Sequence, residues 1–347
     1  MTQEGNGSPT IGIHGKAKRR TIRALVSCVM AVFCLSWAAA GAEEPPVPPL
    51  PANIRTAEHL VVDDRCGELS AFSVTFRNTR SYTPECFNPA RASEREAPGA
   101  AAGGLSSYYQ YEDGSTLLIP SATSLVYGNR DSERYRQLLV YLKGAGGTPS
   151  ATAEPYPLED ALVRCEHLFS RLHISGLVLD SSFALTADGI GTVTGDMKRG
   201  STPTPACFES FPAEIGAWCL TFRQELDGIR PAGTPQVRIV LTERETALLE
   251  LNRVIDHVND DYELAAQASW QDALGFFSAA HRGKESGSGS FEISRIHIAY
   301  EYELPDGDAL DARAVPCWQI EGREARENQV VGFSEVYRIP DGKKNAV

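Results

Sequence analysis

The sequence lacks the short motifs that mark common catalytic sites. It contains no Gly-x-Ser-x-Gly nucleophile elbow, no His-Glu-x-x-His zinc motif, no phosphate-binding loop and no dinucleotide-binding glycine motif. No two cysteines are separated by two residues, which excludes zinc knuckles and thioredoxin-like redox motifs. The sequence therefore predicts no catalytic residue, no cofactor and no metal site.

Basic patches are also missing after Arg23. Residues 1–42 hold five basic residues and one acidic residue, so the remaining 305 residues carry 28 basic and 44 acidic side chains, a net charge of −16. Such an acidic protein repels nucleic acid and anionic lipid, which excludes nucleic acid as a partner. Methionine is scarce and charges of both signs are mixed, unlike in a coiled coil or a disordered chain.

The N-terminal residues have the pattern of an export signal. An uncharged apolar run, residues 24–40, follows a basic segment, and the small residues Ala40 and Ala42 precede Glu43. This order predicts a signal peptide over residues 1–42, cleaved between Ala42 and Glu43. The alternative is an uncleaved anchor, although the apolar run is short for a membrane span. We therefore expect an extracytoplasmic protein, secreted or tethered, which contacts the membrane only if the segment is retained.

Six cysteines follow the predicted signal peptide. An even number outside the cytoplasm indicates disulfides, whose pairing the sequence does not determine. Free buried thiols are the alternative. Proximity in the sequence favours the pairs Cys66–Cys86, Cys207–Cys219 and, by remainder, Cys165–Cys317.

Composition divides the exported chain into regions. A Pro-rich spacer should be stiff and extended, and a Gly- and Pro-rich stretch near the middle should link two parts. The predicted regions are the spacer 43–55, an N-terminal α+β region 56–143, a linker 144–157, a module 158–235 and a C-terminal α+β module 236–347.

Three helices are expected. Apolar spacing predicts one from Ala161 to Leu172, a capping box at Ser269 and Asp272 with an apolar stripe predicts a second, and the third is expected over residues 131–142. Five Asp-Gly pairs predict tight turns, and alternating apolar residues predict strands. The expected strands lie at 72–76, 108–111, 117–119, 218–222, 237–241, 296–302, 315–320 and 331–339. These elements favour the α+β class, with antiparallel sheets each packed by a helix.

Some polar and aromatic residues have two interpretations. The acidic residues around Asp256 and Asp260, or Asp306 and Asp311, have the ligand chemistry of a metal site, but a loop and a hairpin turn explain them more simply. Trp318 is expected in the core of the C-terminal module, where its indole N–H would need a partner.

Three stretches carry a resemblance to a known group of proteins. They are Trp218 to Pro231, where a strand ends in an Asp-Gly turn; the helix openings Glu159-Asp-Ala-Leu and Gln271-Asp-Ala-Leu; and Ile298 to Tyr300 with Val315 to Trp318. In this order, residues 155–342 resemble the extracytoplasmic proteins of the YycH and YycI kind and related secreted clostridial families of unknown function. The terminal Asp341-Gly342 lacks the Asn-Ala that often precedes it in that group.

The resemblance implies repeated PepSY-like modules, each a helix packed on an antiparallel sheet. It implies a non-enzymatic envelope protein of the Gram-positive type that binds or regulates another envelope protein, such as a sensor-kinase ectodomain or a protease. It carries over no catalytic residue. Two other functions remain open from the residues alone: a secreted hydrolase that uses scattered carboxylates on cell-wall glycan, and a structural surface protein.

Overall fold

The computed structural model describes residues 49–63, 69–95, 106–144, 154–186, 216–265, 269–282, 290–305, 309–326 and 329–339. The predicted signal peptide with its cleavage site at Ala42 and Glu43 lies outside these residues, as do Cys66, Cys207 and much of the predicted linker. Within the described ranges, no helix has the length and apolar character needed to cross a membrane.

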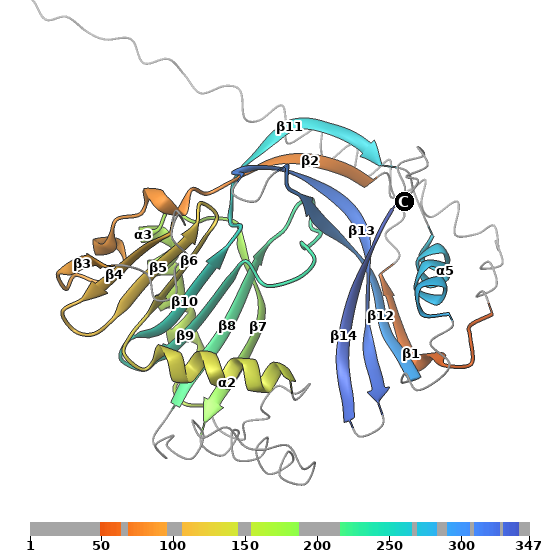
Figure 1. Cartoon of the computed structure of the whole chain (residues 1–347), viewed down its shortest axis with the longest axis horizontal. Helices are drawn as coiled ribbons and strands as arrows, with labels where there is room; N and C mark the ends of the chain where they lie inside the picture. The colour runs from red at the N-terminus through yellow and green to blue at the C-terminus, as the bar shows by residue number, and fades with distance from the viewer. Residues whose placement is uncertain are drawn as a thin grey trace, which may run out of the picture. The chain divides into compact units, whose positions relative to one another are not determined.

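One sheet contains eight antiparallel strands in the order β3-β4-β5-β6-β10-β9-β8-β7 (Figure 1). Their bounds are β3 Ala92–Arg95, β4 Ser107–Tyr111, β5 Thr116–Ser121, β6 Ser124–Gly128, β7 Leu177–Thr186, β8 Gly216–Gln224, β9 Val237–Thr242 and β10 Thr246–Asn252. The predicted turn at Asp113-Gly114 is confirmed, because it joins β4 to β5. Gly114 has a φ of 86°, a conformation that favours a residue without a Cβ atom.

Helices cover both faces of this sheet, which explains the apolar sequence of β8. Helix α3, Leu158–Arg171, shares a core with Trp218 and Leu220 on one face. Helix α2, Ser132–Gly144, shares a second core with Cys219 on the other face. Successive side chains of a strand point to opposite faces, so a strand that is covered on both sides needs a continuous apolar run. Both helices are confirmed, α3 as apolar spacing predicts and α2 as expected over residues 131–142.

A second sheet contains six strands, along the path β1-β12-β13-β2-β11, with β14 beside β13. Two short 3-10 helices, Thr79–Ser81 and Pro84–Cys86, follow β2. Strand β1 runs parallel to β12, and the other pairs are antiparallel. The strand bounds are β1 Ile54–Asp63, β2 Leu69–Phe76, β11 Ile255–Ala265, β12 Ser290–Glu303, β13 Asp311–Arg326 and β14 Gln329–Arg338.

The two faces of the six-stranded sheet differ in chemistry. Helix α5, Trp270–His281, lies on one face and shares a core with Trp318 and Phe291 (Figure 1). Its predicted capping box at Ser269 and Asp272 is confirmed. The opposite face carries polar side chains, because residues that alternate with the core positions point away from α5. In the register of β12 and β13, Arg295 lies opposite Glu321 and His297 opposite Gln319.

The connection from β8 to β9 crosses from one sheet to the other. It turns at Asp227-Gly228, whose φ angles of 50° and 74° are those of a tight turn with two left-handed residues. Leu226 and Ile229 flank the turn and pack into the core of the six-stranded sheet. The N–H of Tyr300 in β12 donates to the carbonyl oxygen of Arg230 at 3.1 Å. The connection is therefore fixed to β12 by apolar contacts and by its backbone.

A buried pair of amide side chains lies at the base of this connection. Gln224 is 7% exposed and Gln236 is 2% exposed. The Gln224 amide donates to the carbonyl oxygens of Ser175 at 2.9 Å and Ile255 at 2.8 Å, and its oxygen accepts from the Ile255 N–H at 2.6 Å. The Gln236 amide donates to the Gln224 oxygen at 3.2 Å and to the hydroxyl of Tyr302 at 3.3 Å. Since Ile255 begins β11 and Tyr302 lies in β12, the pair joins the two sheets.

The predicted fold class, α+β built from repeated PepSY-like modules, is wrong. Among the described residues three α-helices accompany fourteen strands, and the strands form two large sheets. The physical reason is pairing between distant segments: β1 and β2 join strands from the C-terminal part of the chain, so the six-stranded sheet is not a local module. The predicted region 56–143 contributes to both sheets, and the predicted loop after Asp256 forms part of β11.

We predict that Trp318→Ala lowers the free energy of unfolding by about 3–5 kcal/mol, because Trp318 is 1% exposed in the core under α5. Urea unfolding followed by circular dichroism measures this loss. Trp318→Phe is the matched variant, and its expected loss is smaller. It keeps a ring in the core and removes an indole N–H that has no hydrogen-bond partner among the described residues. Unchanged stability of the alanine variant would contradict this assignment.

We also predict that Gln224→Met lowers the free energy of unfolding by about 2–4 kcal/mol, although it preserves side-chain length. The substitution leaves the backbone groups of Ser175 and Ile255 buried without their side-chain partner. Because Gln224 and Gln236 bond to one another, the double variant with Gln236→Met should lose less than the sum of the two single losses. Additive losses in urea unfolding would show that the two amides act independently.

Candidate functional site

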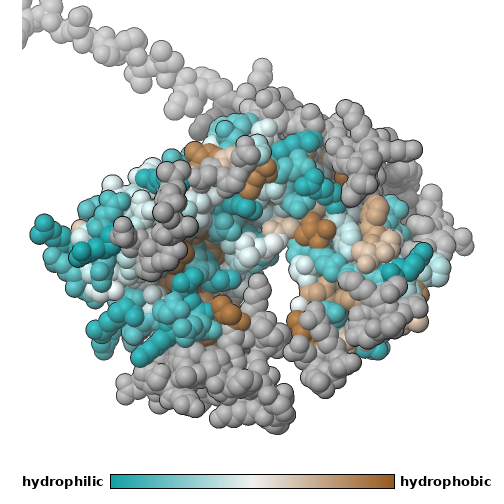
Figure 2. Space-filling model, viewed as in Figure 1, coloured by the Kyte–Doolittle hydropathy of each residue, from teal (hydrophilic) through white to brown (hydrophobic). Residues whose placement is uncertain are grey.

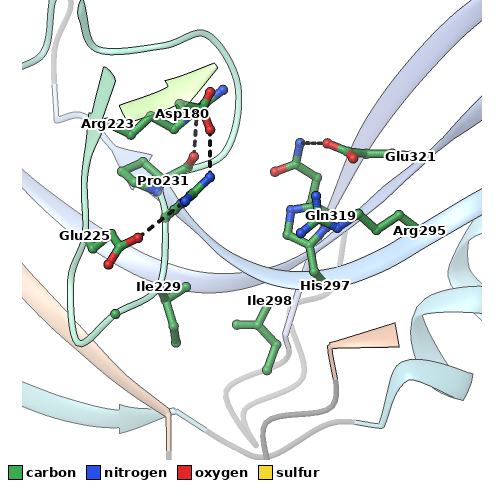
Figure 3. A pocket seen from close by; sticks show the side chains of 12 residues that line it. Asp180, Arg223, Glu225, Ile229, Pro231, Arg295, His297, Ile298, Gln319 and Glu321 are labelled. Atoms are coloured by element: carbon green, nitrogen blue, oxygen red, sulfur yellow. Dashed lines mark hydrogen bonds and ion pairs between the residues drawn. The ribbon is translucent and has the colours of Figure 1, made fainter. Parts of the chain in front are cut away.

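A polar pocket lies where the β8–β9 connection meets the polar face of the six-stranded sheet (Figure 3). Its cavity volume is about 320 Å³, a size that suits a small ligand or one or two residues of a peptide. Strands β7 and β8 with the turn line one wall, and strands β12 and β13 line the other. Both sheets therefore contribute side chains to the pocket.

The first wall contains a chain of four charged side chains. Asp180 on β7 accepts from Arg223 Nε through Oδ2 at 2.9 Å and from Arg230 Nη1 through Oδ1, also at 2.9 Å. Arg230 Nε donates in turn to Glu225 Oε1 at 3.2 Å. Both oxygens of Asp180 thus hold a guanidinium, which leaves that carboxylate committed to the wall rather than to proton transfer.

The two arginines of this wall have different roles. Arg223 is 14% exposed, and its Nη atoms donate to the carbonyl oxygens of Pro231 at 2.9 Å and Gly233 at 2.8 Å. Its donors are thereby used to hold the β8–β9 connection in place. Arg230 is 45% exposed, and its Nη2 atom has no bond to any described residue. Arg223 therefore fixes the connection, whereas Arg230 keeps one nitrogen, Nη2, without a partner among the described residues.

The second wall is built from alternating residues of two paired strands. The Gln319 amide donates to Glu321 Oε1 at 3.0 Å and to the hydroxyl of Ser334 at 2.7 Å. These bonds orient Glu321 and leave its second oxygen without a partner in the described part of the chain. The guanidinium of Arg295 makes no hydrogen bond or ion pair with a described residue. Figure 3 shows Arg295, His297, Gln319 and Glu321 together on this side, across from Asp180 and Glu225.

The charges of the pocket are balanced. Three arginines, at 223, 230 and 295, stand against three carboxylates, at 180, 225 and 321, with His297 beside them. Ile229 and Ile298 border the pocket from the core side. A balanced polar pocket with an apolar border disfavours polyanions, which would meet its carboxylates, and purely apolar ligands, which would leave its charged groups without partners.

The described residues on the face drawn in Figure 2 do not form one broad apolar area. On the face drawn in Figure 2, hydrophobic residues form small groups that hydrophilic residues separate. Large exposed apolar patches are the usual sign of a hydrophobic docking surface. The chemistry of this face is therefore polar and charged.

Sequence reasoning named none of the pocket residues as a site. The signals present were the Asp227-Gly228 turn and the alternation of Arg295 with His297 and of Gln319 with Glu321, at the ends of two predicted strands. Such alternation indicates a polar sheet face, but it does not tell which other element lies against that face.

The predicted disulfide pairs have different outcomes. Cys165 and Cys317 are free thiols, so the predicted pair Cys165–Cys317 is not formed. Cys165 lies on the buried face of α3, whereas the Cys317 thiol in β13 donates to the carbonyl oxygen of Ala299 at 3.2 Å. The other two predicted pairs, of Cys86 with Cys66 and of Cys219 with Cys207, each include a residue outside the described ranges, and within those ranges Cys86 and Cys219 are free.

The acidic residues considered as metal ligands have other partners. Asp256 forms an ion pair with Arg77, and Asp311 accepts from the hydroxyl of Thr75 at 2.7 Å. Asp306 lies outside the described residues. Over the part of the chain that the structure describes, no three His, Cys, Asp or Glu side chains form a group with metal-site geometry.

Comparisons with known proteins concern the fold alone. No protein-family model matches the chain, and no curated protein gives a significant match. A similar solved structure is that of an uncharacterized protein from Eubacterium rectale, with a TM-score of 0.52 and 12% sequence identity. The match covers 81% of this chain and 86% of that chain. The two chains therefore share an architecture over most of their lengths, and the resemblance to the YycH and YycI kind stays a prediction.

We predict that Cys165 and Cys317 resist iodoacetamide at pH 8 in the folded protein. Burial raises the pKa of each thiol from its ordinary value of 9.0 to about 12, so the reactive thiolate is scarce. Peptide mass spectrometry should find both cysteines modified only after unfolding in guanidinium. Detection of a peptide that links Cys165 to Cys317 would contradict the structure. The raised pKa also means that these thiols stabilise the fold fully below pH 9 and lose that contribution as the pH approaches 12.

Proposed function

We propose that this is an exported, non-enzymatic binding protein that recognises a component of the cell envelope through the polar pocket between its two sheets. The single observation that carries the proposal is the pocket itself, whose charged side chains come from four strands and one turn. Ion pairs and hydrogen bonds hold the side chains of the first wall and Glu321 in place before any ligand arrives. Such preorganisation lowers the entropy cost of binding.

The organisation of the carboxylates supports binding over bond cleavage. A glycoside hydrolase needs one carboxyl group that donates a proton and another that acts as base or nucleophile. Here Asp180 is bonded to Arg223 and Arg230, Glu225 is bonded to the same Arg230, and Glu321 accepts from the Gln319 amide. These partners hold the carboxylates in fixed positions, which suits recognition of a polar ligand.

Export and the envelope as the place of action rest on the sequence, through the predicted signal peptide 1–42 and the acidic net charge of the remainder. The partner that we propose is an envelope or extracellular component, and a sensor ectodomain or a protease remains the kind of protein that it would report to. Edge strands such as β7 and β14 offer backbone groups for such a protein contact.

The test is affinity capture from an envelope extract on immobilised protein comprising residues 43–347. We expect a saturable partner that Arg295→Glu releases, because the variant reverses the charge of a pocket wall. The matched control is Arg323→Glu on β13, an exposed residue with the same charge change that does not line the pocket. Equal capture by wild type and both variants would show that the pocket is not the recognition site.

A further inference from the structure

We infer that the pocket binds a small zwitterion, a free amino acid or short peptide that carries both an ammonium group and a carboxylate. This inference rests on the proposed function and specifies the ligand of the same site. It rests on the donor and acceptor atoms of the charged lining side chains that have no partner among the described residues, which we call open groups.

The open cationic groups come from both walls. Arg230 uses Nε and Nη1 for Glu225 and Asp180 and keeps Nη2 available, and the Arg295 guanidinium is bonded to no described residue. Two guanidinium groups that line one pocket are suited to a carboxylate, whose two oxygens accept bidentate hydrogen bonds. They supply the anion-binding half of the site.

The open anionic groups also come from both walls. Glu225 uses Oε1 for Arg230, and Glu321 uses Oε1 for Gln319, so that in each the Oε2 atom is bonded to no described residue. An ammonium group has three donors and no acceptor, and carboxylate oxygens are its natural partners. A ligand with a carboxylate alone would leave these two oxygens facing its own negative charge.

Charge balance selects the zwitterion over other polar ligands. Because the lining carries three arginines and three carboxylates, a doubly charged anion such as phosphate would meet as many negative as positive side chains. Neutral sugars are commonly bound against aromatic rings, and among the lining residues only His297 has one. A ligand with one charge of each sign offers a partner to the open groups of both signs.

The apolar border limits the side chain of the ligand. Ile229 and Ile298 lie together at one end of the pocket in Figure 3, below the charged groups. Both belong to the core of the six-stranded sheet and are almost fully buried. A short aliphatic side chain such as that of alanine matches this border and the cavity volume of about 320 Å³.

The test is isothermal titration calorimetry of the protein comprising residues 43–347 with three peptides: Ala-Ala, acetyl-Ala-Ala and Ala-Ala amide. We expect Ala-Ala to bind, and each blocked peptide to bind at least about tenfold more weakly, since each lacks one of the two charges. Higher salt should weaken the binding of Ala-Ala. Equal affinity for the three peptides, or no heat from Ala-Ala up to about 10 mM, would overturn the inference.

Two variants separate the halves of the site. Arg295→Gln should weaken the binding of Ala-Ala about tenfold and leave the weak binding of Ala-Ala amide unchanged, because the amide lacks the carboxylate. Glu321→Gln should also weaken the binding of Ala-Ala about tenfold and leave the weak binding of acetyl-Ala-Ala unchanged, because that peptide lacks the ammonium group. Arg323→Gln is the control and should bind like wild type.

If Ala-Ala does not bind while Arg295→Glu still releases the envelope partner, the ligand class is wrong and the proposed function stands. If neither the binding of Ala-Ala nor the capture of the envelope partner depends on Arg295, the ligand class and the proposed function are both wrong.

Discussion

The structure depends on how two buried glutamine side chains satisfy the backbone where the chain passes from one sheet to the other. At that point β8 ends, the connection to β9 leaves the eight-stranded sheet, and β11 starts the return path. Backbone groups there lie outside the regular ladders, and a buried polar group without a partner is costly. Gln224 and Gln236 supply those partners and bond to each other. Apolar side chains at these positions would leave several backbone groups unpaired.

The pocket follows from this junction. Arg223 and Glu225 flank Gln224 in the sequence, so the amide network that fixes the end of β8 also fixes two charged side chains of the wall. Arg223 then holds the carbonyl groups of the connection, and Asp180 on the neighbouring strand ties Arg223 to Arg230. The remaining wall is the polar face of β12 and β13, to which the connection is bonded at Tyr300. The residues that stabilise this junction therefore also shape the wall of the proposed binding pocket.

The difference between the predicted and observed fold has a clear origin. Each predicted helix forms, and each lies on a sheet, as periodic apolar spacing and the Ser269 capping box indicate. The α+β prediction did not include pairing between strands that lie far apart in the sequence. β1 and β2 precede the strands that they pair with by more than a hundred and fifty positions in the sequence. Local periodicity contains no information on such pairing, which depends on the apolar faces that become covered together.

The sequence by itself determined the local structure: the three described helices, most strands, the turns at Asp113-Gly114 and Asp227-Gly228, and the core position of Trp318. These features depend on contacts between near neighbours and on intrinsic backbone preferences. Tertiary structure alone decided the two large sheets, the separation of Cys165 from Cys317, and the pocket. The side chains that line the pocket, from Asp180 to Glu321, lie close together only because long-range strand pairing and the β8–β9 connection place the two sheets side by side.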